Sequence, residues 1–113
     1  MKEIMCNNKE LIDIVKQYNL ILDWNGAEAY KIVDGNDIIA VIEYDFISDI
    51  NAYYIYNFEV INKGCGIGTK YIDFLKKKGK FELNYKDEKS KSFWLKNGFK
   101  VIDEYNGTIE FKL

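Results

Sequence analysis

Apolar and polar residues in the amino-terminal segment follow the pattern of one amphipathic helix between short extended stretches. Residues 2–5 favour a strand, and Asn7 or Asn8 can cap a helix. The apolar stripe of that helix consists of Leu11, Ile12, Ile14, Val15 and Tyr18. Residues 19–24 fit either a strand or a short helical turn, and the pair Asn25 and Gly26 is a typical break after them.

Three strand patterns follow, and short turn sequences separate them. The strands are predicted at residues 27–33, 38–47 and 52–61, with turns at residues 34–37 and 48–51. Turns this short join neighbouring antiparallel strands. The middle of the chain is therefore predicted to form an antiparallel meander.

The second half of the chain alternates helices with shorter strands. The predicted elements are a helix over residues 67–78, a strand over 81–85, a helix over 88–96 capped by Asp87, and a closing hairpin over 99–113. Because a helical crossover joins strands 52–61 and 81–85, these two must run parallel. The pattern predicts one domain over residues 1–113, of the α+β (α/β) class, built on a mixed and mostly antiparallel sheet.

Composition narrows the range of functions. The net charge of −2, with lysines and acids interleaved, argues against a nucleic-acid partner. The absence of His removes the usual general base and the commonest metal ligand, so no metal site is expected. No apolar run reaches the ~20 residues of a membrane span, and the first residues do not resemble a signal peptide. We therefore expect a cytoplasmic protein without a membrane partner, in which Cys6 and Cys65 are reduced thiols.

Three glycines at alternate positions join the third strand of the meander to the helix that follows. Gly64, Gly66 and Gly68 allow a ligand to approach the backbone closely, and the first N–H groups of the helix have no partners within it. Such a loop can cradle a phosphate group, although a tight turn with nothing bound has the same pattern. The spacing fits neither the P-loop, which ends in Gly-Lys-Ser/Thr, nor the Gly-x-Gly-x-x-Gly loop of dinucleotide-binding proteins.

Two motifs resemble those of the GCN5-related N-acetyltransferases. The loop Lys63-x-x-Gly66-x-Gly68 is similar to the Arg/Gln-x-x-Gly-x-Gly/Ala loop of that family, with Lys in the first position. The stretch from Asp87 to Phe99 is similar to the second signature of the family, Asn-x-x-Ala-x-x-Phe-Tyr-x-x-x-Gly-Phe. The two motifs occur in the family's order, which makes the resemblance more specific than either motif alone.

The resemblance implies a central sheet with helices on both faces, in which the parallel strands 52–61 and 81–85 splay apart around acetyl-coenzyme A. This cosubstrate would pair its pantetheine arm with the strand backbone and place its pyrophosphate on the amides of the glycine loop. The main-chain N–H near Val60 is the implied oxyanion donor. The residues implied in binding are Phe58, Glu59, Val60, Lys63, Gly64, Cys65, Gly66, Ile67, Gly68, Thr69, Asp87 and Trp94.

Three side chains are candidates for the chemistry of acetyl transfer. Glu82 alternates with apolar neighbours on its strand and stands where ribosomal-protein N-terminal acetyltransferases have their base, although an exposed or salt-bridged glutamate gives the same pattern. Glu59, on the preceding strand, is the second candidate base. Trp94 stands where the family often has a tyrosine acid, and an indole can donate a hydrogen bond but cannot deliver a proton.

The resemblance implies an N-acyltransferase that moves an acetyl group from acetyl-coenzyme A to a primary amine. Residues 19–26 are too few for the two helices that roof the acceptor site in the family. We therefore expect an open site that accepts a protein lysine or amino terminus, or a polyamine-like amine. An alternative is a catalytically weak or inactive module of the same fold that binds coenzyme A or a protein partner. A monomer and a homodimer both fit the sequence.

Overall fold

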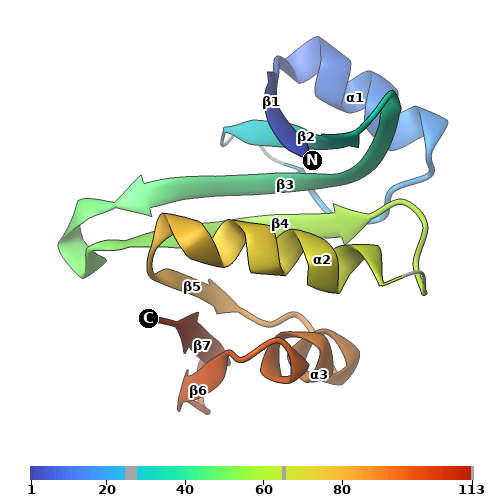
Figure 1. The fold of residues 1–113 in the computed structure, drawn as a ribbon. Helices are drawn as coiled ribbons and strands as arrows, with labels where there is room; N and C mark the ends of the chain where they lie inside the picture. The colour runs from blue at the N-terminus through green and yellow to red at the C-terminus, as the bar shows by residue number, and fades with distance from the viewer. Residues whose placement is uncertain (25–27, 65, 113) are drawn as a thin grey trace.

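The computed structural model describes residues 1–24, 28–64 and 66–112. Within these residues, seven strands form one sheet in the order β1-β2-β3-β4-β5-β7-β6 (Figure 1). The strands are β1 (Lys2–Cys6), β2 (Ala29–Asp34), β3 (Asp37–Ile47), β4 (Ala52–Val60), β5 (Phe81–Asn84), β6 (Lys100–Asp103) and β7 (Thr108–Phe111). The helices are α1 (Asn8–Gln17), α2 (Ile67–Leu75) and α3 (Glu88–Lys96), with 3-10 turns at Ser48–Ile50 and Lys76–Lys78.

The pairing of the strands confirms the predicted topology. Strands β1 to β4 form an antiparallel meander. Helix α2 then carries the chain across the sheet, so that β5 pairs with β4 in parallel. The hairpin of β6 and β7 closes the sheet, and β7 lies between β5 and β6 because it pairs antiparallel with both. The sheet is therefore mixed and mostly antiparallel, as expected.

Side-chain caps explain where two of the helices begin. The Asn7 side chain accepts the N–H of Glu10 at 2.8 Å, so Asn7 rather than Asn8 is the cap of α1. The Asp87 side chain accepts the N–H of Ser90 at 2.7 Å and caps α3, as predicted. Each cap satisfies a backbone donor that the helix itself leaves without a partner.

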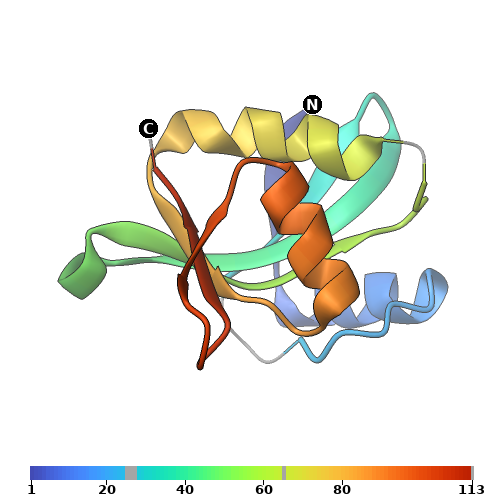
Figure 2. The same ribbon diagram turned by 90° about the horizontal axis from the view of Figure 1, so that it is seen from below.

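The helices cover both faces of the sheet, which confirms the expectation from the resemblance (Figure 2). Helix α1 packs on one face through Leu11 and Ile14, which join a small core with Ala29 and Val41. Helices α2 and α3 pack on the opposite face over a larger core. That core includes the buried residues Ile32, Ala40, Ile42, Tyr44, Ile55, Tyr71, Ile72, Leu75, Phe81, Leu83, Trp94, Phe99 and Ile109.

The segment after α1 has no regular structure. Residues 19–24 form neither a helix nor a strand, so neither predicted alternative holds there. Asn19 adopts a left-handed conformation with φ of 53°, which takes the chain away from the helix. The expected break at Asn25 and Gly26 lies outside the described residues. No helix in the described part of the chain is both long and apolar enough to cross a membrane.

Strand β4 contains an extra residue that reverses its faces. Glu43 of β3 opposes Asn57, whereas the next residue, Tyr44, opposes Ile55, so Tyr56 is left over as a β-bulge. Regular alternation would place Ile55 and Asn57 on the same face. Instead, Ile55 packs in the larger core, while Asn57 faces the α1 side and contacts the segment after α1. The bulge thus brings polar side chains of β4 to the α1 side of the sheet.

We expect the protein to lose stability above about pH 10, because two buried tyrosines hold their protons. The Tyr44 hydroxyl donates to Glu3 Oε2 at 2.8 Å, and the Tyr71 hydroxyl donates to Glu3 Oε1. Burial, followed by the bond to the Glu3 carboxylate, raises the pKa of both phenols well above the ordinary value of 10.0. Above that pH the unfolded chain releases protons that the folded chain keeps. The free energy of unfolding therefore falls by up to ~1.4 kcal/mol per pH unit for each phenol.

Urea unfolding between about pH 8 and pH 11 measures this slope. The Tyr71→Phe variant should lose the contribution of one phenol to the slope. Tyr105 is 96% exposed, so Tyr105→Phe should leave the slope unchanged and serves as the control. Identical slopes for the wild type and both variants would contradict this account of alkaline destabilisation.

Candidate functional site

Strands β4 and β5 pair at one end only and then separate. Their parallel register contains two pairs, Tyr53 with Phe81 and Tyr54 with Glu82. Beyond Tyr54, a cleft of about 850 Å³ opens between the two strands and extends along α2 and α3. The expected splaying of the parallel pair is therefore present.

The cleft exposes one edge of β4. The N–H of Ile61 donates to the carbonyl of Ile39 on β3 at 2.9 Å. In an antiparallel pair the hydrogen-bonded positions alternate, so the N–H and C=O groups of Phe58 and Val60 point away from β3. These groups face the cleft, where they offer donors and acceptors to an extended ligand.

The cleft runs from this edge to the amino terminus of α2. Gly66 caps α2 in the left-handed conformation, with φ of 74°, and no described side chain caps the helix. The first N–H groups of α2 therefore remain available to a ligand, at the positive end of the helix dipole. Gly64 also has a positive φ, of 86°. A turn with two such residues strongly favours glycine at both positions.

Gly68 serves the packing of the two helices. A Cβ atom at this position would lie 3.0 Å from Phe93 Cε1 and 3.3 Å from Val60 Cγ2. Gly68 therefore allows α2, α3 and β4 to approach closely at the wall of the cleft. Sequence reasoning placed Gly68 in a phosphate cradle, and the structure adds this steric reason for a glycine.

The cleft is lined by four lysines as well as by backbone donors. They are Lys63, Lys86, Lys89 and Lys96. Only Lys63 was predicted from the sequence. Lys89 and Lys96 lie two helical turns apart, so the spacing of polar residues along residues 88–96 could have placed them on one side of α3. The lysines and the α2 terminus place positive charges in the cleft, and such charges suit phosphate groups.

Every described residue that was predicted to bind the cosubstrate lines the cleft. These residues are Phe58, Glu59, Val60, Lys63, Gly64, Gly66, Ile67, Gly68, Thr69, Asp87 and Trp94. Cys65 lies outside the described residues. Residues that are far apart in the sequence thus meet in one cleft. Ile21, Leu22 and Asn57 also line it and were not predicted.

Glu59 is a buried anchor for the segment after α1. Its side chain is 5% exposed, and Oε1 accepts the N–H groups of Ile21 and Leu22 at 3.1 and 3.2 Å. Oε2 lies 3.1 Å from the Ile21 nitrogen and 3.9 Å from Lys63 Nζ. Both carboxylate oxygens are therefore engaged in holding the irregular segment against the cleft.

Glu82 lies where β4 and β5 begin to separate. Its register partner is Tyr54, the last β4 residue that pairs with β5. Its carboxylate lies 3.4 Å from Lys80 Nζ, which is equally close to Glu110. Glu82 is not one of the described residues that line the cleft. Glu82 therefore forms a salt bridge, which is one of the alternatives that the sequence left open, and it lies at the narrow end of the cleft.

Trp94 is part of the aromatic wall between the cleft and the core. It is 5% exposed, and its ring lies 5.0 Å from that of Phe99 and 5.8 Å from that of Phe58 between centroids. Such contacts fix the indole by packing. Trp94 thus lines the cleft from a rigid position.

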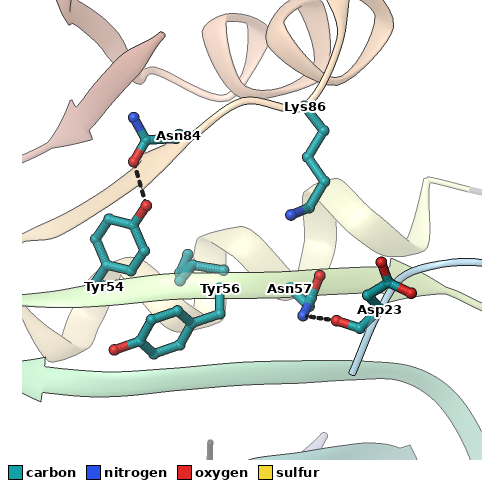
Figure 3. Close-up of a pocket in the computed structure, with 7 residues that line it drawn as sticks. Asp23, Tyr54, Tyr56, Asn57, Asn84 and Lys86 are labelled. Atoms are coloured by element: carbon teal, nitrogen blue, oxygen red, sulfur yellow. Dashed lines mark hydrogen bonds between the residues drawn. The ribbon is translucent and has the colours of Figure 1, made fainter. Parts of the chain in front are cut away.

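A second, smaller cavity opens on the α1 side of the separated strands (Figure 3). It has a volume of about 350 Å³. Its lining residues are Asp23, Tyr54, Ile55, Tyr56, Asn57, Asn84 and Lys86. The two hollows are neighbours at β4 and β5, because they share the lining residues Ile55, Tyr56, Asn57, Asn84 and Lys86.

Comparison with solved structures identifies the fold, whereas comparisons of sequence find no match. No family model matches the chain, and no curated protein matches it by sequence. YhhK of E. coli, named as an N-acetyl transferase and solved with coenzyme A, matches over 100% of both chains with a TM-score of 0.68 and 13% identity. GCN5 of Tetrahymena matches 99% of this chain and 96% of its own, with a TM-score of 0.69 and 14% identity.

A third similar structure is the ribosomal-protein-S18-alanine N-acetyltransferase from Escherichia coli. It has a TM-score of 0.68 and 9% identity, over 98% of this chain and 92% of its own. Identities this low establish a shared fold and leave the reaction to be argued from the site. Strand order, the separated parallel pair and these matches agree: the chain has the fold of the GCN5-related N-acetyltransferases.

Proposed function

We propose that the protein is an acyl-coenzyme A-dependent N-acetyltransferase that moves an acetyl group from acetyl-coenzyme A to a primary amine. The observation that carries the proposal is the cleft that leads from the open β4 edge to the uncapped terminus of α2. Acetyl-coenzyme A has a pantetheine arm with two amides, which fits a strand edge, and phosphates, which fit a helix terminus. The coenzyme A in the YhhK structure supports the same choice of ligand.

The residues of the cleft divide between the two ends of this cosubstrate. The backbone of Phe58 and Val60 would bind the amides of the pantetheine arm, and the N–H groups after Gly66 would bind the pyrophosphate. Lys63, Lys89 and Lys96 would add positive charge at the phosphate end. Asp87 already caps α3 through Ser90, so its proposed contact with the arm would use its second oxygen.

In the proposed reaction, the amine nitrogen attacks the thioester carbonyl carbon and forms the new C–N bond. The C–S bond then breaks, and coenzyme A leaves as a thiolate. A main-chain N–H of the open β4 edge near Val60, one that the pantetheine arm leaves free, would stabilise the negative charge that develops on the carbonyl oxygen. The proton that the amine loses passes to a base or to water. Holding both substrates in the two neighbouring hollows would supply much of the rate, ~7–11 kcal/mol in ideal cases.

Trp94 and the two glutamates take different parts in this proposal. Trp94 would be a wall for the end of the arm that carries the thioester, and the thiolate would leave without an acid from that position. Glu59 would hold the segment after α1, because both its oxygens are engaged. Glu82, at the narrow end, would accept the proton through water.

We expect Glu82→Gln to lower turnover about 10-fold or more. A glutamine cannot accept the proton, whereas its size preserves the strand. The matched control is Glu110→Gln, because Glu110 shares the same lysine at 3.4 Å but lies on β7. Steady-state assays across pH measure the effect. Equal behaviour of the two variants would remove Glu82 from the mechanism.

The acceptor proposed here is an accessible amine, on a protein or of the polyamine type. The support is the irregular segment of residues 19–24, which replaces a helical roof on the α1 side with a single stretch of chain. A site covered in this way can admit a long side chain attached to a large molecule. Acetylation of a small enclosed metabolite, with no activity on any peptide, would contradict this acceptor class.

Two measurements on the purified chain test the proposed function. A thiol-release assay with acetyl-coenzyme A and a panel of peptides, lysine derivatives and polyamines measures transfer, and a thermal shift with the cosubstrate measures binding. We expect both signals. A thermal shift without transfer to any amine would favour the binding module that the sequence left as the alternative. Absence of both signals would refute the acetyltransferase and the module together.

A further inference from the structure

The smaller cavity contains a buried hydrogen-bond acceptor that no described residue uses. Asn57 is 4% exposed, and its Oδ1 atom is buried without a hydrogen-bond partner among the described residues. A buried polar atom without a partner costs ~1–3 kcal/mol, so native structures rarely keep one without a reason. Oδ1 points into the space between Asn57 and Lys86 (Figure 3). A ligand with an N–H or O–H group would satisfy it.

The orientation of the Asn57 amide is locked. Nδ2 donates to the carbonyl oxygen of Asp23 and to Glu43 Oε1, each at 2.6 Å. These two bonds use both hydrogens of the amide group. Turning the amide over would place Oδ1 against two acceptors, which is unfavourable in a buried site. Oδ1 therefore faces the cavity as a fixed acceptor, and Glu43, which is fully buried, holds it there.

The other residues that line the cavity limit which ligands fit it. The Asn84 amide is engaged, because Nδ2 donates to the carbonyl of Asn106 and to Thr108 Oγ1, and Oδ1 accepts from the Tyr54 hydroxyl. Tyr54 and Tyr56 line the same side, with ring centroids 5.0 Å apart. Aromatic rings suit an aliphatic stem. The rest of the lining is mostly polar and includes Asp23 and Lys86, so the cavity offers an aromatic wall to the stem of a ligand that ends in a hydrogen-bond donor.

We propose that Asn57 is a specificity-determining residue for the acceptor, and that its Oδ1 accepts a hydrogen bond from an unbranched primary alkylamine such as a lysine side chain. This inference rests on the proposed acetyltransferase function. A neutral primary amine can give one N–H to Oδ1 and still direct its lone pair at the thioester. When the nitrogen attacks, it gains positive charge, and the bond to Oδ1 becomes stronger in the transition state. Asn57 takes no proton, since an amide is not a base at neutral pH.

Steady-state kinetics of two variants test the hydrogen bond. Asn57→Leu removes the acceptor atom, and we expect the KM for the amine to rise about 10- to 100-fold while the KM for acetyl-coenzyme A stays near the wild-type value. The conservative variant Glu43→Gln keeps an oxygen that accepts from Asn57 Nδ2 and leaves Asn57 Oδ1 in place. We expect its amine KM to stay well below that of Asn57→Leu. Equal impairment of both variants, or an unchanged amine KM in Asn57→Leu, would overturn the inference.

A binding experiment separates this inference from the proposed function. Nitrogen-15 spectra of the wild type with coenzyme A are recorded while Nα-acetyl-lysine amide is added, and the Asn57 side-chain amide signals should shift and saturate. Nα-acetyl-norleucine amide has a similar stem without the amine and should leave them unchanged. A shift without acetyl transfer would refute the proposed function and retain only the binding of an amine at Asn57. Transfer to lysine without a shift at Asn57 would overturn the inference and retain the function.

Discussion

Replacement of Gly66 by valine should abolish acetyl-coenzyme A binding while the chain still folds. A Cβ built at Gly66 meets no atom within 4 Å beyond its immediate neighbours, so the new side chain would project into open space at the terminus of α2. That space is where the pyrophosphate would approach the N–H groups of the helix. We expect the dissociation constant to rise about 100-fold or more, since a displaced phosphate loses several charge-assisted hydrogen bonds. Titration calorimetry measures the change.

Gly35 provides a matched control for backbone strain. It has a φ of 64°, its Cβ would also meet nothing within 4 Å, and it lies in the turn between β2 and β3 rather than in the cleft. Valine at either position must adopt a left-handed conformation, which costs ~1–2 kcal/mol. Gly35→Val should therefore lower the melting temperature as Gly66→Val does and leave binding intact. Normal binding by Gly66→Val, or equal loss in both variants, would refute the assignment of the loop.

The second large effect is expected at Glu59. Glu59→Ala should lower the free energy of unfolding by ~2–4 kcal/mol, because the N–H groups of Ile21 and Leu22 lose their buried acceptor. The segment of residues 19–24 has no regular hydrogen bonding of its own and should separate from β4. Urea unfolding measures the stability change. Hydrogen exchange should show faster exchange at the Ile21 and Leu22 amides than in the wild type.

Glu59→Gln distinguishes an anchor from a base. Glutamine keeps one oxygen that can accept both N–H groups, so we expect a smaller loss of stability and turnover close to the wild type. A catalytic base would respond in the opposite way, with stability kept and turnover reduced ~100-fold or more. That outcome would establish Glu59 as the base and contradict its assignment as an anchor.

Local sequence signals were sufficient for the elements and for most of the cleft. Asp87 caps a helix as predicted, and Asn7 is one of the two caps predicted for the first helix, because a cap needs only a short side chain next to its own backbone. The glycines of the loop mark a turn between strand and helix, since left-handed conformations favour glycine regardless of the rest of the fold. The crossover between β4 and β5 forces them to be parallel through chain connectivity alone.

The contacts between distant segments were beyond the reach of sequence patterns. The sequence made Glu59 a candidate base and gave no sign that its carboxylate accepts the N–H groups of Ile21 and Leu22, which lie far from it along the chain. Glu82 shares Lys80 with Glu110 of β7, which lies far from both along the chain. That Lys89 and Lys96 line the cleft follows only from the position of α3 in the tertiary structure.

The sequence by itself determined the helices, the strands, their order and the loop that ends at Gly66. These features follow from backbone conformation and from side chains acting on neighbouring residues. Only the tertiary structure decided which way Asn57 faces, because one extra residue at Tyr56 reverses the alternation of β4. A bulge arises from the fit between two strands, and period-two patterns do not contain it. That fit directs a locked buried amide into the cavity on the α1 side.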